Sequence, residues 1–107
     1  MSNDKAQEKL DNLMLRILVF VDRNGKVVSK NGNRMSSSLS MAYVDKEFDI
    51  KMSAFCHCMG NGSCSATVRY KGALVFNASG SYTSGPYGVK AKTYECGDWE
   101  NKFPKEH

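Results

Sequence analysis

The chain has 107 residues, of which 41% are hydrophobic and 24% are charged, and its formal net charge is +4. This length fits one domain, and the composition is typical of a globular chain rather than a disordered one. The longest apolar run, residues 17–21, is too short to cross a bilayer, and the start of the chain lacks the features of a secretory signal. We therefore expect a cytoplasmic protein without a membrane span, whose mild basicity suits an acidic partner without requiring one.

The first predicted element is an amphipathic helix at residues 3–23, where apolar side chains recur at spacings of three and four. Asp4 and Glu8 near its start and Arg23 near its end agree with the helix dipole. Gly25 is expected to end the helix in a left-handed conformation. The apolar stripe is broad, so we expect a curved sheet to grip the helix, or the helix to take part in self-association.

Short strands follow the helix. Residues 26–30 predict a strand that ends in a tight hairpin at Asn31-Gly32, because Asn-Gly favours such turns. Residues 35–40 are small and polar, which predicts irregular structure, with an extended segment from about Leu39. From residue 48 to residue 58, apolar and polar side chains alternate, as in a strand with one buried face.

The hairpins set the predicted register. A loop at residues 59–63 would place Ala54 opposite Val68 and Cys58 opposite Cys64. A three-residue turn with a left-handed Gly72 would then pair Val68 with Leu74 and keep one face of the sheet apolar.

The last predicted elements are a loop at residues 83–88 and a final strand at residues 89–96, with Tyr82 opposite Val89. Trp99 and Phe103 are expected to anchor the tail. The whole pattern predicts an α+β fold of one domain, residues 1–107. Its N-terminal amphipathic helix packs on one face of an antiparallel β-meander of five or six strands at residues 26–96, and a C-terminal tail covers residues 97–107.

All four cysteines and one of the two histidines lie in residues 56–64 or at Cys96. In the predicted register Cys56, Cys58 and Cys64 face inward, whereas His57 and Cys96 face outward. We therefore expect buried thiols, no cofactor and no Cys–His catalytic pair. The alternatives are a zinc site formed by Cys56, Cys58, Cys64 and Cys96, a Cys58–Cys64 disulfide, or a reactive thiol.

The outward-facing side chains of the predicted sheet combine cations with aromatic rings. This combination suits single-stranded nucleic acid, because cations neutralise phosphates while rings stack on bases, although solvated strands also carry such residues only to stay soluble. Tyr87 lies on a Gly/Pro loop and is a candidate interface residue. The candidate binding residues are Lys51, Phe55, His57, Arg69, Tyr87, Lys90, Lys92 and Tyr94.

We predict a non-enzymatic binding or adaptor domain that presents a sheet face and loops to a macromolecular partner, with a protein as the expected partner. The sequence contains no phosphate-binding glycine loop and no carboxylate dyad that would indicate catalysis. The alternatives are a basic module that binds nucleic acid through the outer sheet face, and a thiol- or zinc-dependent protein that uses the cysteine hairpin.

Overall fold

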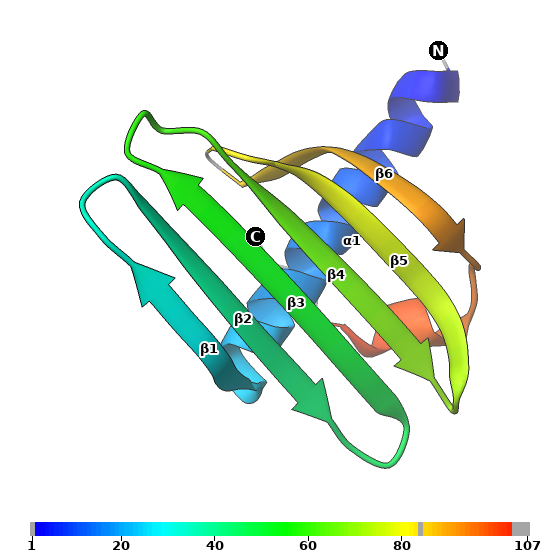
Figure 1. The fold of residues 1–107 in the computed structure, drawn as a ribbon. Helices are drawn as coiled ribbons and strands as arrows, with labels where there is room; N and C mark the ends of the chain where they lie inside the picture. The colour runs from blue at the N-terminus through cyan, green and yellow to red at the C-terminus, as the bar shows by residue number, and fades with distance from the viewer. Residues whose placement is uncertain (1, 84, 104–107) are drawn as a thin grey trace.

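The computed structural model describes residues 2–83 and 85–103 as a helix packed against an antiparallel sheet (Figure 1). The sheet has six strands in chain order, so every strand pairs with its neighbour in the sequence. The predicted α+β meander is therefore confirmed. The elements are α1 (Ser2–Asn24), β1 (Lys26–Gly32), β2 (Ser36–Val44), β3 (Phe48–His57), β4 (Gly62–Tyr70), β5 (Ala73–Tyr82), β6 (Pro86–Tyr94) and the 3₁₀ helix η1 (Asp98–Lys102).

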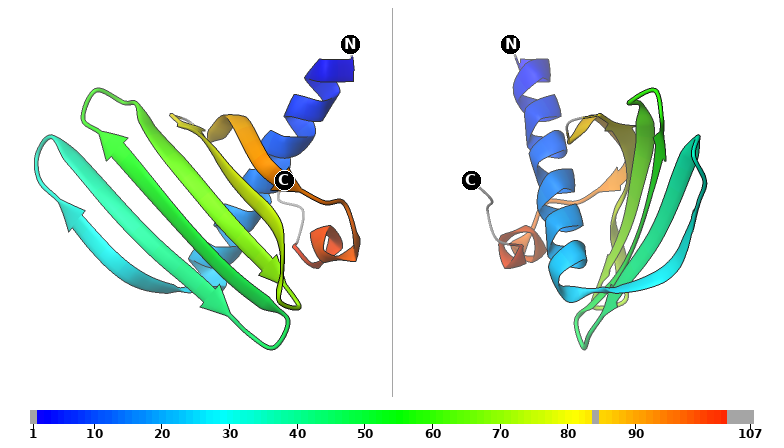
Figure 2. Two further views of the ribbon diagram at one scale, coloured as in Figure 1. Left: turned by 45° about the vertical axis from the view of Figure 1, so that its right-hand side comes forward. Right: turned by 90° about the vertical axis from the view of Figure 1, so that its left-hand side faces the viewer.

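The core lies between α1 and the sheet face that points toward it, here called the inner face. Leu13 and Ile17 of α1 are almost fully buried, as are Ile50 of β3 and Val68 of β4. The strands place these side chains inward by their period of two. Figure 2 shows η1 on the same side of the sheet as α1, while no described element covers the opposite, outer face.

The helix crosses the sheet diagonally (Figure 1). Its N-terminal half lies beside β6, where Gln7 Nε2 donates to the carbonyl of Val89 at 3.0 Å. The amide of Val89 donates in turn to Asp11 Oδ1 at 2.9 Å. The C-terminal end of the helix lies against β2, so the helix leaves β1 and the neighbouring ends of β2 and β3 uncovered.

Gly25, which joins α1 to β1, is needed because the backbone of another strand lies close to it, and not because it adopts a left-handed conformation. The prediction of a left-handed Gly25 was wrong, because the glycines with positive φ in the described residues are Gly60, Gly72, Gly85 and Gly88. A Cβ on Gly25 would lie 2.6 Å from the carbonyl oxygen of Ala42. The absence of a side chain therefore lets the helix end pack directly on the β2 backbone.

The first hairpin turns later than predicted. Gly32 is still paired with Ser37, so the Asn31-Gly32 turn was wrong. The side-chain oxygen of Asn33 accepts hydrogen bonds from the amides of Met35 and Ser36, at 2.7 and 3.1 Å, and forms the turn locally. The segment predicted to be irregular is thus the start of β2. Its consecutive serines point alternately to the two faces of the sheet.

The β3–β4 hairpin has a different register from the predicted one. Ala54 lies opposite Cys64, not Val68, because the turn is centred nearer Met59. Hydrogen bonds between His57 and Asn61 (2.7 Å) and between Gly60 and His57 (2.9 Å) close this turn. The shift is an even number of residues, so the same side chains face inward.

The β4–β5 connection was also predicted wrongly. It is a two-residue turn in which Lys71 and Gly72 both have positive φ, at 52° and 84°. An irregularity in the ladder next to Val75 then returns the apolar residues to the inner face, and Val68 lies opposite Phe76 rather than Leu74.

The last strand begins earlier than predicted, with Tyr82 opposite Pro86 rather than Val89. Beyond it, Trp99 and Phe103 are 3% and 1% exposed, so their predicted anchoring role is confirmed. Arg16 of α1 holds this segment by donating to the carbonyls of Glu100 and Phe103, each at 2.5 Å. No helix in the described part of the chain combines the length and apolar character that a membrane span needs.

Candidate functional site

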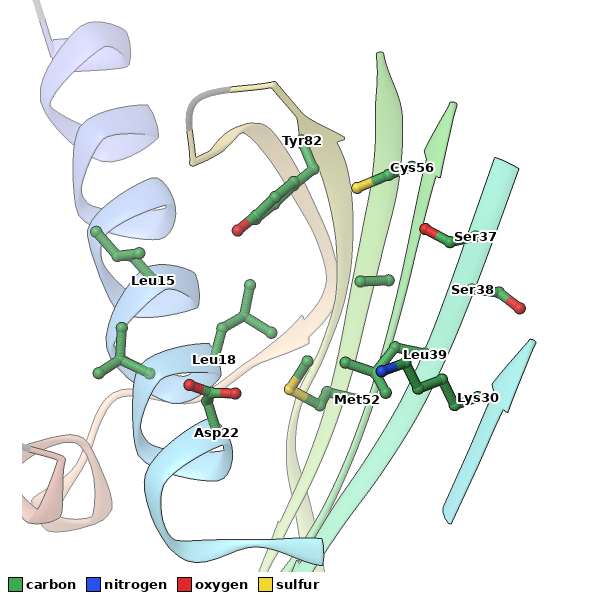
Figure 3. Close-up of a pocket in the computed structure, with 12 residues that line it drawn as sticks. Leu15, Leu18, Asp22, Lys30, Ser37, Ser38, Leu39, Met52, Cys56 and Tyr82 are labelled. Carbon is green, nitrogen blue, oxygen red and sulfur yellow. The ribbon is translucent and has the colours of Figure 1, made fainter. Parts of the chain in front are cut away.

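An apolar groove opens where α1 diverges from the sheet, on the side of β1 (Figure 3). Its volume is about 390 Å³, which is within the range of ligand and side-chain binding pockets. The helix contributes Leu15, Leu18 and Val19, and β2 and β3 contribute Leu39 and Met52. Leu15 is 38% exposed, so this part of the helix wall is open to solvent.

Polar groups stand at the edge of the groove. Asp22 belongs to α1 and Lys30 to β1, so opposite charges lie on opposite walls. Figure 3 shows the sulfur of Cys56 and the hydroxyl of Ser37 on the groove side, whereas Ser38 points away. The groove therefore has an apolar floor and a small number of polar groups at its rim, which is the usual make-up of a binding site.

The two edges of the sheet differ. The β6 edge is covered at Val89, where Gln7 and Asp11 of α1 bind both backbone groups, as described above. The β1 edge borders the groove, and all seven of its residues, Lys26–Gly32, are exposed. Within the described residues no further strand pairs with β1. Its backbone is therefore open to another chain.

Exposed apolar residues gather at this open edge. Val27 and Val28 of β1 are 55% and 68% exposed. The alternation of β1 brings Val27 to the inner side, opposite Met41, and the ladder is irregular beyond it. Lys30 of β1 lines the groove, so the open strand edge adjoins it.

The cysteines do not gather at one point. Only Cys64 of the four is buried, which corrects the expectation of buried thiols. Burial raises the pKa of the Cys64 thiol. Cys96 follows the far end of β6, where Lys9 Nζ donates to its sulfur at 3.4 Å. Among the described residues no three His, Cys, Asp or Glu side chains are placed to hold a metal ion.

Cys58 and His57 lie closer than predicted. We expected them on opposite sides of a strand, but β3 ends at His57 and Cys58 is the first turn residue. The Cys58 sulfur is 3.9 Å from His57 Nδ1, which also accepts the Met59 amide at 3.2 Å. The imidazole is thereby engaged by the turn, and this contact is a structural element of the hairpin.

Most candidate binding residues do reach the outer face. The register places Lys51, Phe55 and His57 of β3 there, with Arg69 of β4 and with Tyr87 and Lys90 of β6. Lys92 is exposed beside an irregularity of the ladder. Phe55 and Tyr87 are 41% and 52% exposed, so both rings are accessible.

Tyr94 does not belong to this set. It lies opposite Phe76 on the inner side and packs edge-on against that ring, with centroids 5.7 Å apart. Its hydroxyl donates to Glu100 Oε1 at 2.9 Å. Burial and this hydrogen bond raise the pKa of Tyr94. The irregularities of the β5–β6 ladder, which the sequence pattern does not show, reverse its expected side.

No protein-family model, curated protein or solved structure matches this chain. The functional conclusions below therefore depend on the geometry of its own residues.

Proposed function

We propose that this protein is a non-enzymatic binding domain that takes up an extended segment of a partner protein beside β1. The observation that carries the proposal is the continuity of an open strand edge with an apolar groove. A segment that added a strand to β1 would satisfy the exposed backbone groups of that strand. Its inward side chains would cover Val27 and close the open side of the groove against Leu15 and Val19.

The contrast between the two sheet edges supports this site. Helix side chains bind the backbone of β6 at Val89, so the fold covers that edge at this position. An irregular ladder and two lysines provide the only comparable protection of β1 among the described residues. Such features discourage pairing with an identical edge but leave a complementary segment free to bind.

Charge indicates the kind of segment. Lys26, opposite Ala42, lies on the outer side of β1, whereas Lys30, opposite Leu39, lies on the groove side. A partner segment whose outward residues are acidic would meet the opposite charge of Lys26, while its inward apolar residues would lie on the groove side. We therefore propose an extended segment in which apolar and acidic residues alternate.

The test is selection from a library of displayed random 12-residue peptides on the purified protein. Enriched peptides should alternate apolar with acidic residues, and their affinity should fall about three- to sevenfold in Leu15→Ala, since about 1 kcal/mol of newly buried leucine surface is lost. Val44→Ala is the matched control, because Val44 is 67% exposed at the far end of β2. Failure to enrich any peptide, equal binding by Leu15→Ala, or a stable dimer that buries β1 would each contradict the proposal.

A further inference from the structure

The outer face of the sheet carries an ordered polar surface that is separate from the groove. The ladder aligns one outward residue from each strand in a row of Ser29, Ser40, Ser53, Ser65, Ser79 and Lys90. We call this set the serine row. The hydroxyls of Ser53 and Ser65 are 2.6 Å apart and hydrogen bonded.

A shallow trough follows the serine row. Small side chains leave a depression of about 280 Å³, and the larger ring of Phe55 lines it. The next row contains Ser38, Phe55, Ser63, Ser81 and Tyr87, so it carries two accessible rings. Strands are about 4.8 Å apart, and three spacings separate β3 from β6, so Phe55 and Tyr87 are about 14 Å apart along this row.

Charge on the outer face is strongly one-sided. Of the acidic residues in the described part of the chain, only Asp49 lies on this face, and it is directly opposite Arg69. Lys51 and Lys90, which flank the trough on β3 and β6, have no carboxylate opposite them in the ladder. The remaining described acids lie on α1, in the β2–β3 turn, or after β6. The trough is therefore floored by hydroxyls and has Lys51 and Lys90 beside it.

We propose that this outer face binds single-stranded nucleic acid laid across the strands. Phosphates would lie over the serine row, where hydroxyls donate hydrogen bonds and Lys51 and Lys90 supply charge. Bases would stack on Phe55 and Tyr87, as bases stack on exposed sheet aromatics in other single-strand binders. An acidic polypeptide would match the charge, but the side-by-side rows of hydroxyls and rings suit the phosphates and bases of a single strand.

The first experiment measures binding of a fluorescein-labelled 20-nucleotide oligothymidylate by anisotropy at several salt concentrations. Two to three phosphate contacts predict an affinity that falls roughly 7- to 18-fold between 50 and 200 mM NaCl. Lys51→Gln with Lys90→Gln should flatten the slope of log affinity against log salt by about 1.4. Lys5→Gln with Lys46→Gln removes the same charge away from the trough and should leave most of the binding.

The second experiment separates stacking from charge. Phe55→Ala and Tyr87→Ala should each weaken oligothymidylate at least about fivefold at constant salt. The inference is overturned if the wild type does not bind at 50 mM NaCl, or if the control lysine pair matters as much as Lys51 and Lys90. It is also overturned if a duplex binds as tightly, or if polyglutamate competes equally and is indifferent to both rings. Leu15→Ala should not change oligonucleotide binding, so this result is independent of the groove.

Discussion

Two nearby positions of α1, one in the core and one at the groove, should differ in how much their replacement changes the free energy of unfolding. Ile17 is fully buried, and its replacement by alanine should leave a closed cavity. The loss of transfer free energy together with the cavity corresponds to about 2–5 kcal/mol. Leu15, two residues earlier, lines a groove that is open to solvent, so Leu15→Ala should cost only about 1–2 kcal/mol without a cavity contribution.

The assay is urea unfolding followed by the fluorescence of Trp99, the single tryptophan. With an m value of about 1–3 kcal/mol/M, the two variants should have separable midpoints and unchanged slopes. Val44→Ala is the control and should change stability by about 0.5 kcal/mol or less. Equal losses at Leu15 and Ile17 would show that the groove is closed and filled in solution, which would refute its assignment as a binding site.

Three further perturbations test the packing. Gly25→Ala should lower the free energy of unfolding by about 1–3 kcal/mol, because the new Cβ would lie 2.6 and 2.7 Å from backbone oxygens. Gly97→Ala is the control: no atom would lie closer than 3.5 Å to its Cβ, so the same urea assay should show little change. Arg16→Met removes two charge-assisted hydrogen bonds to the C-terminal segment, so the free energy of unfolding should fall by about 2–4 kcal/mol and Trp99 emission should shift to the red. Unchanged emission would contradict the role of Arg16 in holding this segment. The raised pKa of Tyr94 means that the folded protein keeps this proton while the unfolded chain releases it, so stability is fully present below about pH 10 and falls as pH rises above it. Tyr94→Phe should flatten that alkaline decline, and an unchanged decline would exclude Tyr94 as its cause.

The sequence pattern predicts the fold because its two periods are strong. The helical spacing of the apolar residues in α1 and the alternation from Phe48 to Cys56 each allow one buried face, and one helix on one sheet satisfies both. Register was less predictable. The Asn33 side chain competes with Asn31-Gly32 for the first turn, and the irregularity near Val75 compensates for a two-residue turn.

The candidate site was only partly predictable for a related reason. Outward residues such as Lys51 and Phe55 follow from alternation alone, whereas Tyr94 depends on ladder irregularities that leave no clear trace in the sequence. The groove depends on the diagonal course of α1, which the Gln7 and Asp11 contacts with β6 help to set. The one sequence signal of the groove was the excess width of the helix stripe at Leu15 and Val19.

The most direct test of the binding proposal is to map an added strand onto the protein. A peptide with valine and glutamate alternating over ten residues would be titrated into ¹⁵N-labelled protein, and amide shifts and hydrogen exchange would be followed by residue. The account predicts that shifts and new amide protection concentrate on β1 and on α1 around Leu15 and Val19, and that the matched valine–lysine peptide has a much weaker effect. Absence of binding at millimolar peptide, or shifts confined to β6 or the outer face with β1 amides unprotected, would contradict it.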